Sequence, residues 1–197
     1  MIKIIFDLIV GIVLAALLLP LGLTIFILIR VFMGYPAIFK QERPGYKEKI
    51  FTLYKFRTMN NKKNSKNLLL PDDKRTTILG NILRKTSLDE LPSIINLLKG
   101  EMSLVGPRPL LPQYLKYYTI EQKRRHNVRP GITGWAQING RNELNWRQKF
   151  DLDIWYVDNQ SFYLDLKILL LTIIKVLKFE GINAKGNRPV EEFKGNN

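Results

Sequence analysis

The longest uninterrupted feature of the hydrophobic pattern is the run from Leu8 to Ile29, where none of the 22 residues between Asp7 and Arg30 is charged. About 20 apolar residues suffice for a helix to cross a bilayer. A cleavable signal peptide would have a shorter apolar region followed by small residues, and the sequence after Ile29 offers no such cleavage site. Because a domain of this size is also too small to surround so long an apolar helix, the run predicts insertion into a membrane.

Pro20, near the middle of this run, predicts a kink or a break, since proline removes a backbone donor and clashes with the preceding turn. A kinked transmembrane helix would place its flanks on opposite sides of the membrane. A broken helix could instead enter and leave through one face, with Lys3 and Arg30 at the same headgroups. Freed backbone groups then need a partner inside the membrane, and Thr24 carries the nearest hydroxyl. In both geometries the basic remainder of the chain is predicted to be cytoplasmic.

Beyond the membrane run, the pattern predicts a β-hairpin followed by helices and loops. Residues 37–39 and 50–54 are rich in β-prone side chains, and Pro44 and Gly45 supply turn chemistry between them. The further elements follow from composition and spacing. They are a polar loop at 60–73, a helix at 78–99 interrupted near Thr86 and Pro92 and stopped by Gly100, a polar helix at 113–125, a loop at 129–140 and a helix at 162–179.

The helix at 162–179 is apolar but carries interspersed lysines, so it is too short and too charged to span a bilayer. It fits an amphipathic helix in the headgroup plane or an ordinary helix facing the core, and the residues leave both open. The whole pattern predicts an α+β, mainly helical fold with a short β-hairpin and amphipathic interfacial helices around one small domain. The expected divisions are a membrane helix at 1–34, a cytoplasmic domain at 35–180 and a polar tail at 181–197.

Charge narrows the choice of partners. Lys and Arg total 31 against 17 Asp and Glu, which gives a formal net charge of +14. Such an excess predicts an anionic partner, which could be nucleic acid, an acidic lipid surface or a phosphorylated substrate. The chain has no cysteine, so disulfides and thiolate metal sites are excluded.

The strongest candidate for chemistry is the segment Ser87-Leu88-Asp89-Glu90-Leu91-Pro92. Ser87 and Glu90 match a capping box at the start of a helix, and Asp89 is an alternative cap that would leave Pro92 better tolerated. Either way, two adjacent carboxylates lie at a helix N-terminus, where the dipole and free N–H groups favour the ionised form. An ionised carboxylate can serve as a nucleophile or as a Mg²⁺ ligand.

Cations lie on both sides of this acidic pair in the sequence. Lys55 and Arg57 end the predicted hairpin on one face, because strand side chains alternate. Arg84 lies a few residues before the acidic pair. His126 is the only histidine and follows two arginines. We interpret it as a surface or packing residue and not as a catalyst.

Two loops add further polar groups. Arg108 lies between Pro107 and Pro109, whose restricted backbone favours presenting the guanidinium to a phosphate or a base. Each feature alone also fits a turn or a surface charge, but their clustering in one small domain favours a binding site. The second loop mixes glycines and an aromatic ring with groups able to hold a nucleotide, namely Arg129, Gln137, Asn139 and Arg141.

Taken in order, these motifs resemble the bacterial sugar transferase family, the small monotopic phosphoglycosyl transferases. The resemblance extends from residue 6 to about residue 178. It rests on the N-terminal apolar segment, Arg43-Pro44-Gly45, Lys55-Phe56-Arg57-Thr58-Met59, Ser87-Leu88-Asp89-Glu90-Leu91-Pro92, Gly106-Pro107-Arg108-Pro109 and Arg129-Pro130-Gly131-Ile132-Thr133-Gly134.

The resemblance implies a catalytic domain on the cytoplasmic face of the bacterial inner membrane. Asp89 would attack the sugar-bearing phosphorus of a UDP-sugar and release UMP, and undecaprenyl phosphate would then take the phosphosugar from the aspartate. Asp89 and Glu90 would be catalytic and would bind Mg²⁺, with Arg108 at the nucleotide end. Together with the loop residues above, the predicted substrate-binding set is Arg43, Lys55, Arg57, Arg84, Pro107, Arg108, Pro109, Arg129, Gln137, Asn139 and Arg141.

The family also implies a re-entrant helix-break-helix at Pro20, although Leu19 stands where relatives commonly have serine. UDP-N,N′-diacetylbacillosamine is the donor that the overall match suggests, and other N-acetylated UDP-sugars for capsule or lipopolysaccharide stay open. Anionic membrane lipids are expected partners, and nucleic acid is not. One rival mechanism makes Asp89 a general base with both substrates bound together. A second rival is a basic, non-enzymatic membrane adaptor, which assigns no role to the acidic pair.

Overall fold

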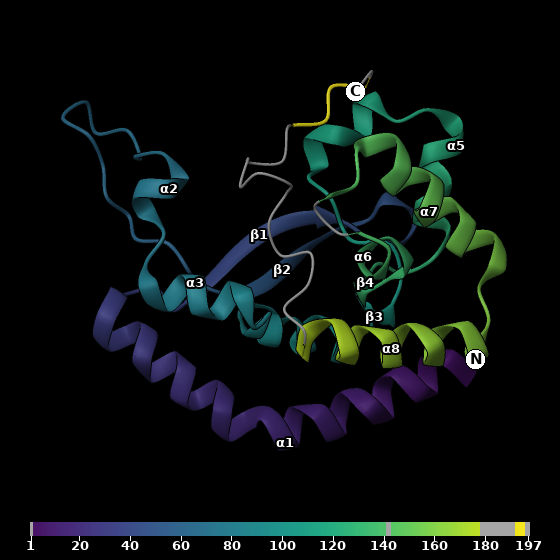
Figure 1. Cartoon of the computed structure of the whole chain (residues 1–197), viewed down its shortest axis with the longest axis horizontal. Helices are drawn as coiled ribbons and strands as arrows, with labels where there is room; N and C mark the ends of the chain where they lie inside the picture. The colour runs from purple at the N-terminus through teal and green to yellow at the C-terminus, as the bar shows by residue number, and fades with distance from the viewer. Residues whose placement is uncertain (1, 141–142, 178–191, 196–197) are drawn as a thin grey trace.

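The computed structural model describes residues 2–140, 143–177 and 192–195, so Arg141 and most of the tail predicted at 181–197 lie outside the described residues. Helix α1, Ile2–Met33, contains the apolar run and is long and apolar enough to cross a membrane by length and composition. Figure 1 shows α1 along the lower edge of the fold as an arc whose two ends lie closer to the other elements than its middle does. The predicted membrane helix is therefore present as a single long element.

The helix is continuous through Pro20, so the predicted break into two helices is wrong. The Thr24 hydroxyl donates to the Pro20 carbonyl at 2.9 Å. Such a bond from a threonine to the preceding turn bends a helix without interrupting it, in agreement with the arc of α1. Entry and exit of α1 through one membrane face stays a prediction.

Polar contacts hold the N-terminal half of α1 against the domain. The buried Asp7 carboxylate accepts a hydrogen bond from the Ser103 hydroxyl at 2.6 Å. Lys3 Nζ lies 2.5 Å from Asp165 Oδ2. The C-terminal half of α1 instead packs apolar side chains against the hairpin and helix α3, Ile78–Lys85. Both halves of the membrane helix are thus attached to the same body.

The predicted β-hairpin is confirmed. Strands β1, Ile38–Pro44, and β2, Ile50–Phe56, pair antiparallel, and the short 3-10 helix η1, Tyr46–Glu48, lies in the turn between them. On β2, the side chains of Phe51, Leu53 and Phe56 are buried. This packing sets the position of Lys55 near the end of β2.

The helix predicted at 78–99 is interrupted where expected. It forms α3, the 3-10 helix η2, Leu88–Ser93, and α4, Ile94–Leu98, and Gly100 adopts a positive φ of 71° after the last turn. The single helix predicted at 113–125 is wrong, since that region forms three short elements. The other helical elements are α2, Asp72–Arg75, η3, Pro112–Tyr117, α5, Ile120–Lys123, η4, Arg124–Asn127, α6, Trp135–Ile138, α7, Trp146–Asn159, and α8, Phe162–Leu177.

The segment predicted as a loop at 129–140 contains α6 and a strand, so that prediction is wrong in part. Strand β4, Gly131–Thr133, pairs in parallel with β3, Ser103–Val105. Glycine allows this close approach, because a Cβ on Gly131 would lie 2.1 Å from the backbone nitrogen of Gly106. In the sequence these glycines indicate a loop, but in the structure they allow the backbones of β3 and β4 to lie close together.

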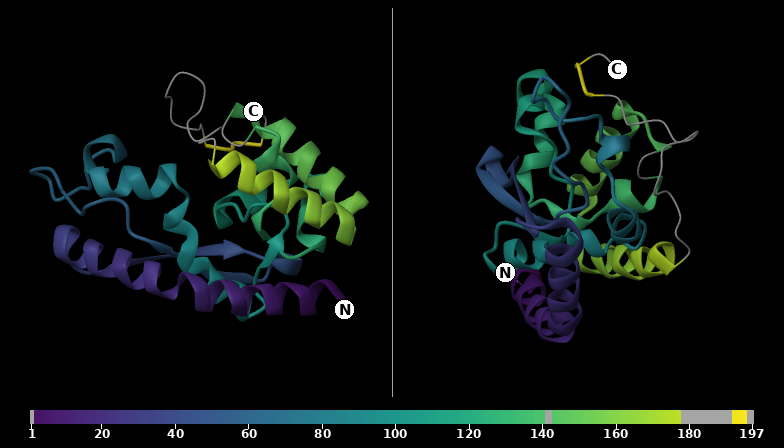
Figure 2. Two further views of the ribbon diagram at one scale, coloured as in Figure 1. Left: turned by 60° about the horizontal axis from the view of Figure 1, so that its bottom comes forward. Right: turned by 90° about the vertical axis from the view of Figure 1, so that its left-hand side faces the viewer.

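Helix α8 packs one face into the core, as the core-facing interpretation of the helix predicted at 162–179 expects, and the interfacial interpretation stays a prediction. Ile168 is fully buried and packs in a cluster with Leu104 and Tyr156. Other apolar side chains of α8, including Leu170 and Ile173, are exposed. Figure 2 shows α8 beside α1 in both views, so the exposed apolar side chains of the two helices belong to neighbouring elements.

An aromatic cluster forms a second part of the core. Tyr114, Trp146 and Phe150 pack around Phe193, whose side chain is only 2% exposed. Phe193 belongs to the tail that the sequence predicts to be polar, and this buried aromatic residue departs from that prediction, whereas Glu192 and Lys194 beside it are exposed. Burial of the Phe193 ring stabilises the position of this short segment, although the residues beside it are polar.

Candidate active site

Asp89 and Glu90 lie in the first turn of η2, directly after Ser87, which has a positive φ of 57°. Ser87 occupies the cap position but makes no side-chain capping hydrogen bond within the described residues. The predicted capping box of Ser87 and Glu90 is therefore wrong, and the alternative with Asp89 as the cap is wrong too, because Asp89 lies inside η2. Pro92 has no N–H to donate to the preceding turn, which agrees with an irregular 3-10 start in place of a regular α-helix.

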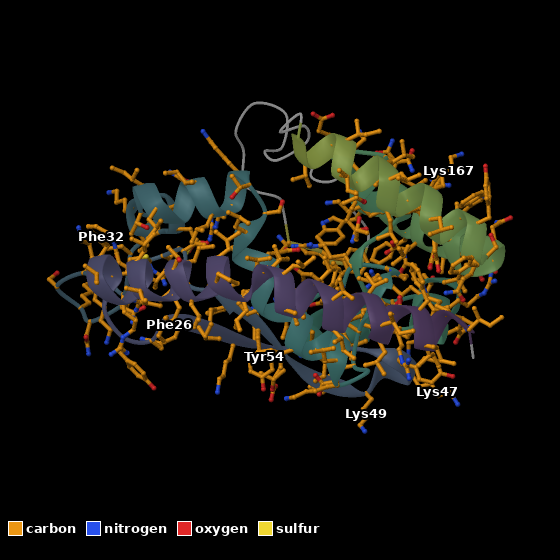
Figure 3. The ribbon with its side chains drawn as sticks, turned by 90° about the horizontal axis from the view of Figure 1, so that it is seen from below. Phe26, Phe32, Lys47, Lys49, Tyr54 and Lys167 are labelled. Carbon is orange, nitrogen blue, oxygen red and sulfur yellow. The ribbon has the colours of Figure 1, made fainter. Side chains whose placement is uncertain are left out.

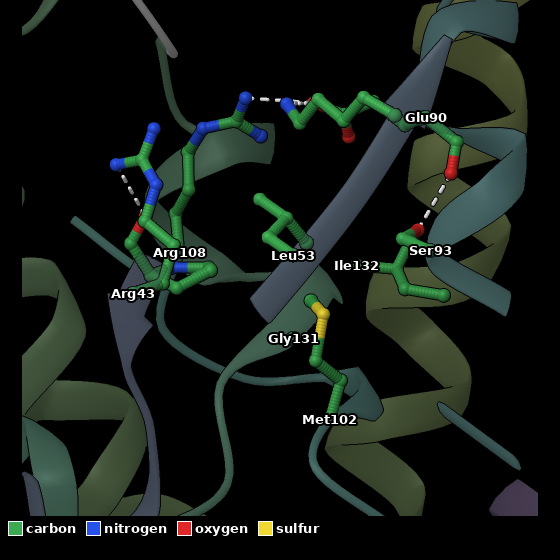
Figure 4. Close-up of a pocket in the computed structure, with 10 residues that line it drawn as sticks. Arg43, Leu53, Glu90, Ser93, Met102, Arg108, Gly131 and Ile132 are labelled. Atoms are coloured by element: carbon green, nitrogen blue, oxygen red, sulfur yellow. Dashed lines mark hydrogen bonds and ion pairs between the residues drawn. The ribbon is translucent and has the colours of Figure 1, made fainter. Parts of the chain in front are cut away.

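The Glu90 carboxylate holds two cations on one oxygen. Lys55 Nζ lies 2.6 Å and Arg108 Nη2 lies 2.7 Å from Glu90 Oε1. Figure 4 shows Arg43 and Arg108 together on one side of a pocket, with Glu90 reaching toward Arg108 from the other side. Residues separated by up to 53 positions thus meet at one carboxylate, because the hairpin, η2 and the loop after β3 converge there.

The charges around Glu90 determine its ionisation. Burial favours a raised pKa, but the charges of Arg108 and Lys55 outweigh burial and hold the pKa of Glu90 well below its ordinary value. In return, Glu90 raises the pKa of Arg108. Burial and the neighbouring Arg108 lower the pKa of Lys55. The lowered pKa agrees with the prediction that Glu90 is ionised. The cause is the two side-chain cations, whereas the sequence indicates the helix start.

Asp89 is in a different electrostatic environment. Burial and the adjacent Glu90 raise the pKa of Asp89, against the opposing charges of Lys55, Arg108 and Arg84. The sequence predicts that the helix start favours the ionised form of Asp89, which means a lowered pKa. The pKa of Asp89 is instead raised, so that prediction is wrong. No hydrogen bond or ion pair of its carboxylate occurs among the described residues. A partly buried carboxylate without such a partner retains its oxygens for an incoming ligand.

The pocket beside this acidic pair has a cationic rim and an apolar floor. Pro109 lines it together with Arg43, whose Nη1 donates to the Pro109 carbonyl at 3.2 Å. Burial, with Arg108 nearby, lowers the pKa of the Arg43 guanidinium to about 10. The remaining lining residues besides Lys55, Glu90 and Arg108 are Leu53, Ser93, Met102, Gly131 and Ile132.

Arg84 is placed beside the acidic pair, as the sequence predicts. Its Nε donates to the Thr58 hydroxyl at 2.9 Å, and its charge lowers the pKa of Asp89. His126 is buried, and its Nδ1 lies 3.1 Å from the Gly45 carbonyl, which confirms its interpretation as a packing residue. Burial lowers the pKa of His126 to about 4.

Arg57, predicted to bind substrate, does not line the described pocket. Its guanidinium donates to the carbonyls of Tyr35 at 3.0 Å and Gly34 at 2.8 Å, and also to that of Met33. Those carbonyls follow or end α1, where the last helical C=O groups have no intrahelical donor. The arginine is therefore a buried C-terminal cap for the membrane helix.

We expect Arg57→Gln to lower the free energy of unfolding by about 2 kcal/mol, because buried carbonyls lose charged donors. The KM for the donor substrate is expected to stay at the parental value. Thermal unfolding in detergent and steady-state kinetics measure the two effects, with the exposed Arg147→Gln as the control. An increase in KM without loss of stability would instead show that Arg57 contributes to substrate binding.

Three predicted substrate-binding residues from the loop at 129–140 lie elsewhere among the described residues. A Cβ on Gly100 would lie 3.9 Å from the guanidinium of Arg129, which places Arg129 at the end of α4. Gln137 is buried on α6, and the Asn139 amide donates to the Trp135 carbonyl at 2.8 Å and so caps that helix. None of the three lines the described pocket, and Arg141 lies outside the described residues.

Sequence reasoning missed Arg125 and Asp153, which form a buried ion pair directly behind the loop that carries Arg108. It also missed the apolar floor of the pocket. Neither has a local signal, because residues from η4 and α7 are brought together only by packing of the aromatic cluster around them. Two unrelated charged residues far apart in sequence do not reveal a shared contact.

These features define a class of protein. A long apolar helix is attached to a small domain in which the Glu90 carboxylate, next to Asp89, binds two cations beside a pocket. This arrangement suits a membrane-associated protein that handles anionic groups. Comparison with known proteins is more specific. Residues 1–179 match the family described as bacterial sugar transferase. The chain belongs to that family, which confirms the resemblance drawn from its motifs.

Several relatives have names that specify a reaction. The chain is 59% identical over 167 residues to the uncharacterized sugar transferase EpsL of Bacillus subtilis, covering 85% of this chain and 83% of that protein. It is 40% identical over 179 residues to UDP-glucose:undecaprenyl-phosphate glucose-1-phosphate transferase of Escherichia coli, covering 86% of this chain and 39% of that protein. It is 39% identical over 165 residues to undecaprenyl-phosphate galactose phosphotransferase of Salmonella typhimurium, covering 75% of this chain and 35% of that protein. The chain thus spans much less than half of the last two.

Proposed function

We propose that this protein transfers a sugar phosphate from a UDP-sugar to undecaprenyl phosphate, giving undecaprenyl diphosphosugar and UMP. The observation that carries the proposal is the convergence of Lys55 and Arg108 on Glu90, next to Asp89, whose carboxylate has no ion-pair partner among the residues that the structure describes. Cations of this kind suit the diphosphate of a nucleotide sugar. Family membership and the relatives named for undecaprenyl phosphate support the same reaction.

In the proposed first step, a carboxylate oxygen of Asp89 forms a bond to the phosphorus that carries the sugar. The bond from that phosphorus to the bridging oxygen breaks, and UMP leaves with the bond's electron pair. In the second step, an oxygen of undecaprenyl phosphate attacks the same phosphorus, and the Asp89 carboxylate leaves unchanged. Splitting the transfer in this way allows the hydrophilic donor and the lipid acceptor to bind in turn.

The donor's phosphates would compete with Glu90 for Lys55 and Arg108, since both anions suit the same two cations. Arg84 adds positive charge near the reacting carboxylate. The two adjacent carboxylates fit a magnesium ion that is bound mainly through substrate phosphates, because magnesium commonly uses only one or two protein carboxylates. Asp89 and Glu90 would hold that ion, which would supply charge neutralisation.

The membrane side of the molecule supports a position at the lipid boundary. Figure 3 views the molecule from below, with the exposed Phe26 and Phe32 on α1 and Lys167 on the neighbouring helix α8. A lysine near exposed apolar side chains suits anionic headgroups. We place the catalytic domain on the cytoplasmic face of the bacterial inner membrane, with anionic lipids as partners.

The sugar is the least constrained part of the proposal. UDP-N,N′-diacetylbacillosamine stays the predicted donor, as the first membrane step of glycoconjugate assembly. The names of two relatives specify glucose and galactose, so UDP-glucose and UDP-galactose should be tested as donors together with the N-acetylated UDP-sugars. Measuring UMP release for each UDP-sugar with undecaprenyl phosphate present identifies the donor.

A trapping experiment tests the covalent step. The purified protein is incubated with UDP-sugar labelled in the sugar, in the absence of any acceptor. We expect about one UMP per protein molecule and label on the peptide that contains Asp89, which undecaprenyl phosphate then removes. Release of UMP only after addition of the acceptor would support Asp89 as a general base, and no UMP under either condition would exclude the transferase reaction.

A further inference from the structure

The loop Pro107–Pro109, which presents Arg108 to the pocket, has all three of its backbone carbonyls occupied. Each carbonyl accepts a hydrogen bond from a different part of the fold. The donors are Gly131 N to the Pro107 carbonyl at 3.0 Å, Arg125 Nη2 to the Arg108 carbonyl at 2.7 Å and Arg43 Nη1 to the Pro109 carbonyl at 3.2 Å. Two prolines already restrict this backbone, and the three bonds fix its remaining freedom.

Arg125 is itself held in place from behind. Its Nη2 and Nε lie 2.7 and 3.1 Å from Asp153 Oδ2, and both side chains are nearly fully buried. The guanidinium carbon lies 6.0 Å from the centre of the Tyr118 ring and 5.7 Å from that of Phe150. A buried guanidinium with a carboxylate on one side and aromatic rings around it has little freedom to move.

The geometry links this buried pair to the pocket through one residue. The Arg108 carbonyl points inward to Arg125, while the Arg108 side chain extends outward to Glu90. The Arg108 side chain is 47% exposed, so few contacts other than Glu90 restrain it. Its position in the pocket therefore depends on where the backbone of the loop is held.

We propose that Arg125 and Asp153 are positioning residues that set the place of Arg108 for binding the donor nucleotide, without touching the substrate. The inference rests on the proposed function, in which Arg108 contacts the nucleotide. Arg125 acts through a carbonyl that only a donor at this location can reach, and Asp153 orients that donor. Lysine cannot replace Arg125 fully, because one ammonium does not reproduce the fork that joins a carboxylate to a carbonyl.

The test is a double-mutant cycle on the full-length protein in detergent, with UDP binding measured by calorimetry and the KM for the UDP-sugar measured by UMP release. We expect Arg125→Gln to weaken UDP binding and raise KM by about tenfold, with Arg125→Lys and Asp153→Asn intermediate. In the Arg108→Gln background, Arg125→Gln is expected to have no further effect, since the side chain that it positions is gone. Equal effects in both backgrounds would show a role independent of Arg108.

A matched control separates positioning from general support of the fold. Arg124 on the same element forms an ion pair with Asp158 on α7, and that pair lies at the surface away from the Arg108 carbonyl. Arg124→Gln is expected to leave UDP affinity at the parental value. If Arg125→Gln does not fold, Arg125→Lys and Asp153→Asn carry the test. Parental UDP affinity in both variants overturns the inference, whereas a parent protein that binds no UDP overturns the proposed function.

Discussion

Asp89→Asn is expected to lower the rate of UMP release by on the order of 10⁴-fold, because an amide oxygen cannot form the phosphoryl intermediate. The substitution keeps the shape of the side chain and removes its charge, so the fold and the neighbouring Glu90 pair with Lys55 and Arg108 are retained. Steady-state turnover with UDP-sugar and undecaprenyl phosphate measures the loss. The same variant is expected to give no labelled protein in the trapping experiment.

The exposed acid Asp151 provides a matched control for Asp89. Asp151→Asn makes the same chemical change on the surface of α7, and parental turnover is expected. Asp89→Glu tests the placement of the carboxylate, since it retains the charge but moves it by one methylene, and a large loss is expected there too. Parental turnover by Asp89→Asn would exclude both a nucleophile and a general base at this position.

Glu90→Gln has the second largest expected effect, a fall in kcat/KM of about 10³-fold. The change leaves Lys55 and Arg108 without the carboxylate oxygen on which both converge. It also removes one of the two proposed magnesium ligands, so the concentration of Mg²⁺ that gives half-maximal activity is expected to rise. A titration of activity with Mg²⁺ after removal of metal by EDTA measures this shift.

Glu42, exposed on β1, serves as the control for Glu90. Glu42→Gln removes one negative charge from the same domain without altering the pocket, so both kcat/KM and the Mg²⁺ requirement are expected to be parental. If Glu90→Gln shows a parental Mg²⁺ requirement together with reduced turnover, Glu90 organises the cations but does not bind the metal.

Local patterns in the sequence were sufficient where one stretch of chain determines its own structure. An uncharged run longer than a bilayer requires predicts α1, and β-prone residues around Pro44 and Gly45 predict the hairpin. Asp89 and Glu90 are found as a pair because they are adjacent. Arg108 is found because two prolines flank it. Each signal lies within a few residues, where backbone geometry and solvation act directly.

Packing of distant segments governs which contacts their side chains make. Arg57 follows the predicted strand pattern, yet it binds the end of α1 because unpaired helix carbonyls lie within reach of its long side chain. Gly131, the first residue of β4, allows a strand pairing that its local sequence does not indicate. The Arg125–Asp153 pair behind Arg108 depends on α7 packing against η4. The amino-acid pattern is thus enough to predict the long apolar helix, the hairpin and the acidic pair. Which cations line the pocket and which support the fold follows from three-dimensional packing, because such contacts depend on distances that no local pattern encodes.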